Sequence, residues 1–305
     1  MSAMTAEASV AAVPAEPQRL FNWTPWIILA PALVFFLIFY VVPIAILLAN
    51  SVQRWDTYTY KVLDYVTLHQ YVRYLLDPYY LEVLIRTVRI AALTTLYSVI
   101  AAYPVAIYLT KAGPTERSIL TLIIISPLLV SVVILCFGWM VVFAPAGLIN
   151  WSLRLIGIVD APLKLKFSEA SVISGLVHVY FPFVALSIFN SLQNIDPATV
   201  RAARILGAGP IRTFWSITLP LSIPGALAGS LIVFALSISS FVVPMFLGGA
   251  WVKVVAYHIW EQNMATIDWP FGAAIAVILL VVTAAIMLTY NRLMERRLFT
   301  GVFAR

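Results

Sequence analysis

Six long apolar runs most constrain the fold of this chain. Each has roughly 20 or more residues, enough for a helix to cross ~30 Å of hydrocarbon. Only 10% of residues are charged, against about 25% in a soluble domain. Because a bilayer has no water to satisfy stray backbone groups, we expect an all-α, polytopic membrane protein with six transmembrane helices. The predicted spans are Trp26–Asn50, Leu84–Thr110, Ile119–Phe143, Ser171–Leu192, Ser222–Leu247 and Phe271–Tyr290.

The runs divide the chain into a tail, a membrane domain and a second tail. We predict a disordered cytoplasmic N-terminal tail over 1–25, a six-span domain over 26–292 and a cytoplasmic C-terminal tail over 293–305. The first run exceeds the ~7–15-residue core of a signal peptide, so it is read as a retained span. Nothing repeats at a period of 20–50 residues, which indicates a unit that needs a partner to enclose a path.

The distribution of basic residues predicts the orientation. With the N-terminus inside, ten Lys and Arg lie on the inner side and nine on the outer side, a near tie. The inner segments are short and dense in base, which favours both termini in the cytoplasm. The net charge of +6 does not predict nucleic-acid binding, because the bases flank spans and form no single basic face. The one cysteine, Cys136, is read as a small buried hydrophobe.

The fifth run and two loops carry further structural predictions. Gly225 and Gly229 are spaced for close helix packing, and Pro244 could kink the same run. The loop over 51–83 is rich in Trp and Tyr, typical of an interfacial belt, of a docking surface or of an aromatic mouth for an organic cation. The piece Leu148–Val159 is too short to span and suits a helix at the membrane interface.

A polar segment over 193–220 separates the fourth and fifth runs and reads as a cytoplasmic loop. Asp196 is a good helix N-cap, and Pro197 suits the first turn, where its missing N–H costs nothing. Gly207 suits a helix end with left-handed geometry. The segment therefore predicts one short capped helix.

Small and basic side chains on that helix indicate a contact with another protein. Ala202 and Ala203 let a partner approach the backbone closely, and Arg201 and Arg204 supply charge near the contact. A plain amphipathic connector is the alternative interpretation.

The same residues carry a resemblance to the permeases of binding-protein-dependent ABC importers. That family has Glu-Ala-Ala, three residues, Gly, nine residues and Ile-x-Leu-Pro in its cytoplasmic loop, and Arg201 stands where the Glu is usual. The matching positions are Ala202, Ala203, Gly207, Ile217, Leu219 and Pro220. Similarity to the spermidine/putrescine permeases extends over nearly the whole chain, through Leu76-Asp77-Pro78, Glu82-Val83-Leu84, Tyr103-Pro104, Gly157-Ile158-Val159-Asp160 and Asp268-Trp269-Pro270-Phe271-Gly272. The stretch Ser131–Met140 differs, because relatives often have an Arg there.

The resemblance implies a transporter subunit of a bacterial inner membrane, not an enzyme. It implies a second permease subunit, two ABC ATPase subunits and an extracytoplasmic solute-binding protein as partners, and a small organic cation such as spermidine or putrescine as cargo. No G-x-x-x-x-G-K-[ST] motif is present, so ATP and Mg are expected on the ATPase. No cofactor and no metal are expected in this chain.

Candidate residues for the substrate path are aromatic and hydroxyl side chains, because the predicted spans hold no carboxylate. We select Trp139, Tyr180 and Trp260 for cation–π contacts of ~0.5–2 kcal/mol each. His178 is the one imidazole inside a span and either serves the path or bonds to a neighbouring helix. Asp268 is either the cap of the last span or a substrate contact.

Three other functions stay open on the residues alone. The first is an ABC importer of another solute, such as an opine, an aminophosphonate or ferric ion. The second is an ion-coupled secondary transporter, which the charge-poor spans disfavour. The third is a scaffold or assembly protein, which gives no reason for the loop spacing.

Overall fold

The computed structural model describes residues 24–56, 61–63 and 66–302. It divides into two units, residues 1–47 and 48–305, and each is described by itself. The secondary-structure elements of the described residues are helices, apart from one short antiparallel pair of strands, β1 (Arg54–Asp56) and β2 (Lys61–Leu63). Five of the described helices are long and apolar enough to cross a membrane, or six if one bent pair counts as a span. The predicted helical membrane architecture is confirmed.

The first unit holds the first predicted span. It consists of α1 (Thr24–Phe36), the π-helical turn η1 (Leu37–Val41) and the start of α2 (Val42–Ser51). In this turn the N–H of Val42 bonds to the carbonyl of Leu37. Pro43 follows directly, and proline both lacks a donor and crowds the preceding turn, so the wider turn accommodates it. Most of the predicted tail over 1–25 lies outside the described residues.

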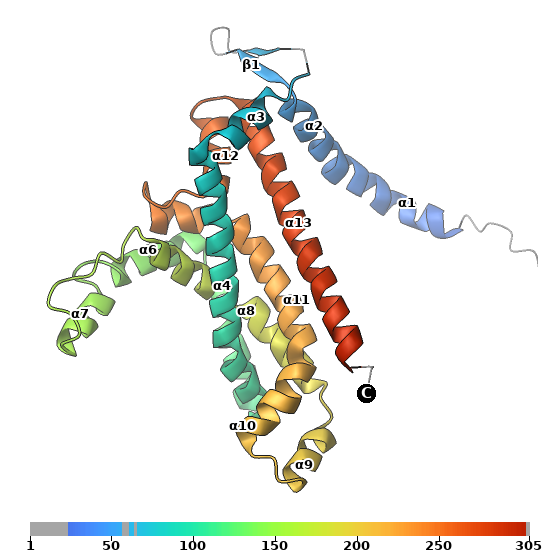
Figure 1. Cartoon of the computed structure of the whole chain (residues 1–305), viewed down its shortest axis with the longest axis vertical. Coiled ribbons are helices and arrows are strands. Elements are labelled where there is room, and N and C mark those ends of the chain that lie inside the picture. Colours follow the sequence, from blue (N-terminus) through green and yellow to red (C-terminus); the bar gives the residue numbers. More distant parts are fainter. Residues whose placement is uncertain (1–23, 57–60, 64–65, 303–305) are drawn as a thin grey trace, which may run out of the picture. The chain divides into compact units, whose positions relative to one another are not determined.

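Three helices form the centre of the second unit: α4 (Pro78–Lys111), α8 (Glu169–Gln193) and α11 (Leu219–Ile238). They lie side by side along much of their length (Figure 1) and share one apolar core. A Cβ at Gly229 would lie 2.8 Å from the Cα of Val184. One at Gly225 would lie 2.5 Å from the carbonyl oxygen of Ser187. The close packing predicted from these two glycines is confirmed.

The third predicted span is wrong as a single helix. Residues 119–143 fall in two helices, α5 (Pro114–Leu129) and α6 (Val132–Val142), at 98° to one another. Val130 and Ser131 between them have extended backbone, and Pro127 lies inside the last turn of α5. A proline removes a helical hydrogen bond and weakens the turn around it. Then follows α7 (Leu148–Leu155), a short helix inside the predicted interfacial piece.

The fifth predicted span starts earlier and ends earlier than expected. The continuous segment comprises α10 (Pro210–Thr213), the π-helical turn η2 (Phe214–Thr218) and α11, which stops at Ile238 instead of Leu247. Non-helical residues follow, and then the π-helical turn η3 (Pro244–Gly248). Pro244 cannot donate the next helical hydrogen bond, so the predicted kink is in fact a break.

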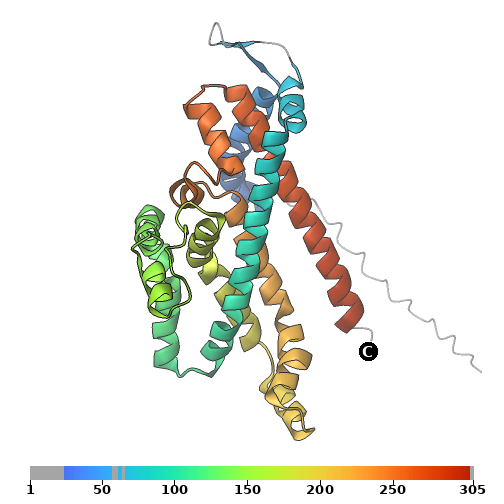
Figure 2. The ribbon, with the colours of Figure 1, turned by 60° about the vertical axis from the view of Figure 1, so that its left-hand side comes forward.

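Aromatic residues close the end of the second unit where α4 begins. This end also holds α3 (His69–Leu76), α12 (Val255–Met264) and the start of α13 (Trp269–Val302) (Figure 2). Tyr74 is buried and stacks on Tyr80 at 5.2 Å, and Tyr80 meets Phe271 edge-on at 5.3 Å. Tyr71, Tyr74 and Tyr80 thus supply core packing here, whereas Tyr79 is exposed. At the other end, α13 continues through Val302, so most of the predicted C-terminal tail is helical.

Candidate functional site: a capped loop helix and a polar cavity in the bundle

The loop between α8 and α11 contains the predicted short helix, α9 (Pro197–Ile205). It begins as predicted: Oδ1 of Asp196 accepts a hydrogen bond of 2.8 Å from the N–H of Ala198, and Pro197 occupies the first turn. The side chain satisfies a donor that the helix itself leaves open.

A Schellman motif ends α9 at Gly207. The N–H of Ala208 bonds to the carbonyl of Ala203, and that of Gly207 to the carbonyl of Arg204, both at 3.0 Å. Gly207 has φ +82°, a conformation that glycine adopts without the penalty of a Cβ. Both predicted boundaries are confirmed.

The two alanines of α9 differ in exposure. Ala202 is exposed, but Ala203 is buried. Of the two alanines, only Ala202 is therefore open to the close approach of a partner. Next to it Ile205 and Leu206 are each 86% exposed, so the free surface of α9 is apolar.

The second half of the motif shapes the entry to α11. Ile217, Leu219 and Pro220 are half-buried, and the N–H of Leu219 bonds to the carbonyl of Phe214 across η2. This wider turn precedes Pro220 as η1 precedes Pro43. These residues fix how the loop joins the span and do not form the exposed surface of α9.

Behind α9 lies an open cavity of about 1020 Å³. Its walls come from the ends of α4 and α8, from α9 and from the start of the α10–η2 segment. Three cations line it, Lys111, Arg201 and Arg204, and no acid among the described residues does. Arg201 and Arg204 thus line this cavity, and both are also exposed.

A second cavity, of about 500 Å³, brings two predicted path residues together. Nε1 of Trp139 in α6 donates a hydrogen bond of 3.0 Å to Nδ1 of His178 in α8. Tyr97 of α4 and Ser174 of α8 also line the space, together with apolar side chains and no carboxylate. Sequence reasoning missed Tyr97 and Ser174. Ser174 and His178 are four residues apart and share a helix face, a signal that could have identified Ser174.

The other three predicted path residues do not line this cavity. Tyr180 hydrogen-bonds to Ser240. Trp260 lies in α12 against Phe241, with ring centroids 5.7 Å apart. Asp268 caps α13 and pairs with Arg73.

Asp268 uses both carboxylate oxygens inside the chain. Oδ1 accepts from the N–H of Phe271 at 3.2 Å, which is the predicted cap. Oδ2 lies 3.0 Å from Nη1 of Arg73. The guanidinium of Arg73 also sits 3.9 Å from the ring centroid of Phe271, a cation–π contact. Through its pair with Arg73, Asp268 joins α3 to α13.

Near the start of α8, Glu169 joins α8 to α4. It pairs with Arg89, and its Oε1 lies 3.6 Å from Nε of Arg86. Arg86 pairs in turn with Glu82, one helical turn earlier. The two arginines that the sequence places at the mouth of a span are therefore both matched by acids.

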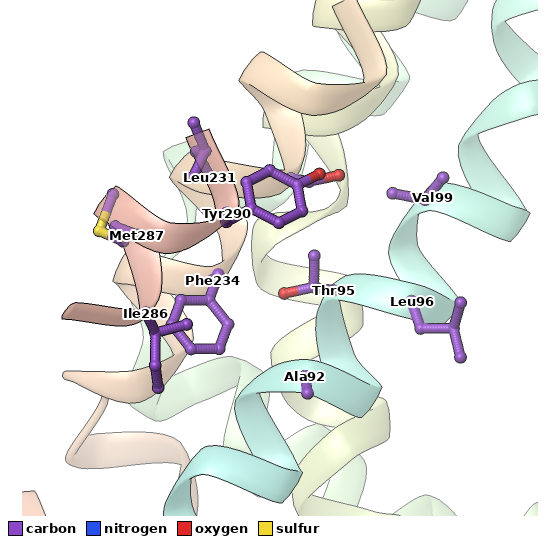
Figure 3. Close-up of a pocket in the computed structure, with 10 residues that line it drawn as sticks. Ala92, Thr95, Leu96, Val99, Leu231, Phe234, Ile286, Met287 and Tyr290 are labelled. Carbon is purple, nitrogen blue, oxygen red and sulfur yellow. The ribbon is translucent and has the colours of Figure 1, made fainter. Parts of the chain in front are cut away.

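A third cavity, of about 410 Å³, lies among α4, α11 and α13 (Figure 3). Its lining is almost wholly apolar. The hydroxyls of Thr95 and Ser230 bond to carbonyls of their own helices. It therefore offers a cation no free polar group comparable to those near His178.

Several helices long enough to cross a membrane, with a capped loop helix between two of them, are the architecture of a membrane transport permease. Residues 80–300 match the family described as binding-protein-dependent transport system inner membrane component, and the chain belongs to that family. It is a permease subunit of an ABC importer in the inner membrane, and it is not an enzyme. A subunit of this class works in a complex with ATPase subunits and a periplasmic binding protein.

Relatives and solved structures agree with this assignment. The chain is 34% identical over 226 residues to the spermidine/putrescine transport system permease protein PotB of Escherichia coli, covering 74% of this chain and 82% of the relative. The Haemophilus influenzae protein of the same name is 31% identical over 265 residues, 86% and 92% of the two chains. A bacterial alginate ABC transporter has the same fold, with a TM-score of 0.75 at 20% identity over 92% of this chain and 96% of the other.

Proposed function

We propose that this permease imports a small organic cation of the spermidine/putrescine class. The observation that carries the proposal is its 34% identity to a spermidine/putrescine permease over most of both chains. The match covers the bundle and the loop helix alike, since it extends over 74% of this chain.

The cavity at Trp139 and His178 supports a weak cation site. Aromatic faces attract ammonium groups by ~0.5–2 kcal/mol each, and Tyr97, Trp139, Ser174 and His178 offer rings and hydroxyls. Because no carboxylate lines the space, a polyamine would be held loosely and released readily. High affinity would belong to the binding protein, and any acids in the path to the partner permease.

The exposed side of α9 is proposed as the contact with the ATPase. Ala202, Ile205 and Leu206 make it apolar, and large exposed apolar groups are typical of protein interfaces. ATP and Mg would be bound by that ATPase, and its motion would reach α8 and α11 through the two ends of the loop. A partner permease would complete the path.

The basic residues support an orientation with the α9 end in the cytoplasm. Lys111, Arg117, Arg201, Arg204 and Arg212 belong to the loops at this end. Short loops rich in Lys and Arg stay inside. Both chain termini are proposed to lie on that side.

The test is uptake of labelled putrescine and spermidine by proteoliposomes that contain this chain with its ATPase, partner permease and binding protein. We expect ATP-dependent uptake that unlabelled polyamine competes away. A complex that hydrolyses ATP but ignores polyamines would refute this substrate class, and the search would move to opines, aminophosphonates and ferric ion.

A further inference from the structure

Three features of the basic cavity behind α9 are unsuited to binding a cation. It is lined by Lys111, Arg201 and Arg204. None of these side chains makes an ion pair with any residue in the described ranges of the chain. Asp196, the acid nearest in sequence, is already used as the N-cap of α9. The cavity therefore presents uncompensated positive charge.

The cavity is also apolar on one side. Ile107, Ile211, Phe214 and Trp215 line it together with the cations. Trp215 is 63% exposed, and tryptophan favours the level of lipid head groups. A free inorganic anion would leave this apolar wall unused.

The position of the cavity matches the surface of a bilayer. Its walls are the last residues of two candidate spans, which end at Lys111 and Gln193, and the first residues of another, which begins at Pro210. Where spans end, phosphate groups begin. Basic pockets between membrane helices on the cytoplasmic side are suited to anionic head groups.

We propose that this cavity binds the head group of an anionic phospholipid such as phosphatidylglycerol. The phosphate is held by Arg201, Arg204 and Lys111, and the upper acyl chain lies against Ile107 and Trp215. The lipid links the end of α4 to α9 and so fixes the base of the loop helix. The proposal rests on the proposed function only for placing this end in the cytoplasm.

The faces of α9 favour a lipid over a protein as the source of negative charge. The residues that line the cavity, Pro197, Val200, Arg201 and Arg204, share one side of the helix. The exposed Ala202 and Leu206 lie on the other side, and Ile205 borders the cavity because it is four residues after Arg201. An ATPase contact centred on Ala202 and Leu206 would therefore leave the lipid site accessible.

Native mass spectrometry of the full chain in its complex tests the proposal. The complex is purified in mild detergent and titrated with phosphatidylglycerol or phosphatidylcholine. We expect a retained phosphatidylglycerol adduct and a much weaker phosphatidylcholine one. Arg201→Gln and Lys111→Gln should each weaken retention about five- to tenfold. Arg201→Lys should keep the charge and the lipid.

Arg212→Gln is the matched control, because Arg212 is an exposed base of the same loop that does not line the cavity. Equal retention in Arg201→Gln, Arg212→Gln and the unchanged chain would overturn the proposal. So would sn-glycerol 3-phosphate displacing the lipid at equal concentration, which would identify a soluble phosphate as the ligand. Unchanged lipid with reduced ATPase affinity in Arg201→Gln would assign the cations to a protein contact. Lipid retention is measured by mass spectrometry without any transport assay. A negative result in the polyamine uptake assay would therefore not affect the test of the lipid site.

Discussion

Trp139 and His178, 39 residues apart in the chain, are joined by a hydrogen bond of 3.0 Å from the indole Nε1 to the imidazole Nδ1. The rings also meet edge-on, with centroids 5.6 Å apart. The bond fixes α6 against α8 at the wall of the polar cavity. Nε2 of His178 takes no part in this bond.

This bond predicts a coupled effect of two substitutions. His178→Phe should destabilise the chain by about 1–3 kcal/mol, because the half-buried indole N–H loses its acceptor. His178→Asn, with an oxygen near the position of Nδ1, should cost less. In a double-mutant cycle by unfolding in mixed micelles, Trp139→Phe should recover part of the loss. Additive losses would contradict the bond, and normal polyamine uptake by His178→Phe would remove this residue from the proposed path.

Gly229 predicts a packing effect between α8 and α11. A Cβ there would lie 2.8 Å from the Cα of Val184, so Gly229→Ala should push the helices apart and cost about 1–3 kcal/mol. Gly138→Ala in α6 is the matched control, since nothing lies within 4 Å of its Cβ position, and it should be neutral or stabilising. Equal thermal midpoints for the two variants would contradict the close contact.

His258 predicts a loss of stability in acid. Burial lowers the pKa of this imidazole, and the nearby carboxylate of Glu261 opposes the shift only in part. A neutral ring explains both of its bonds: Nδ1–H donates to Glu261 at 2.8 Å, and the hydroxyl of Tyr79 donates to Nε2 at 3.1 Å. Lys253 and the rings of Tyr80 and Tyr257 are its other charged and titratable neighbours.

The direction in which stability changes with pH follows from the lowered pKa of His258. The unfolded chain binds a proton near the ordinary value of 6.5, before the folded chain does, so stability is full above this value. It is lost as the pH falls from there through the folded-state pKa. The thermal midpoint should drop as the pH is lowered from about 7 to about 5, and His258→Gln should flatten that drop. His69→Gln, at the exposed start of α3, should leave it unchanged, and an unaltered profile in His258→Gln would contradict the assignment.

The local parts of the site could be predicted from sequence, and the long-range parts could not. Asp196 and Gly207 mark helix boundaries because capping depends on a few neighbouring residues. The 98° bend after Leu129 is not apparent from composition, because the predicted span is apolar on both sides of it. Trp139 and His178 are 39 residues apart and lie on different helices, so neither their bond nor the role of Tyr97 in the same wall could be derived from spacing.

The exposed tip of α9 predicts a loss of coupling without a loss of folding. Leu206 is 86% exposed, so Leu206→Glu should not disturb the bundle, but it places a charge in the proposed apolar contact. We expect at least about tenfold weaker ATPase binding and a matching loss of uptake. Leu206→Met should behave like the unchanged chain. ATPase affinity and uptake that survive Leu206→Glu would rule out this face as the contact.

We expect substitutions of Asp268 to lower the stability of the chain in steps, because its two carboxylate oxygens have separate partners. Asp268→Asn keeps an oxygen for the N–H of Phe271 and loses the charge that faces Arg73. The pair is partly exposed, with 43% of the Arg73 side chain accessible, so its loss should cost at most about 1 kcal/mol. Asp268→Ala removes the cap as well and should cost about a further 1 kcal/mol. Arg73→Gln should cost somewhat more than Asp268→Asn in unfolding experiments, because it removes the cation–π contact with Phe271 as well as the ion pair. If Asp268→Asn abolished uptake while Arg73→Gln did not, the carboxylate would be acting on the substrate, and the purely structural role of Asp268 would be refuted.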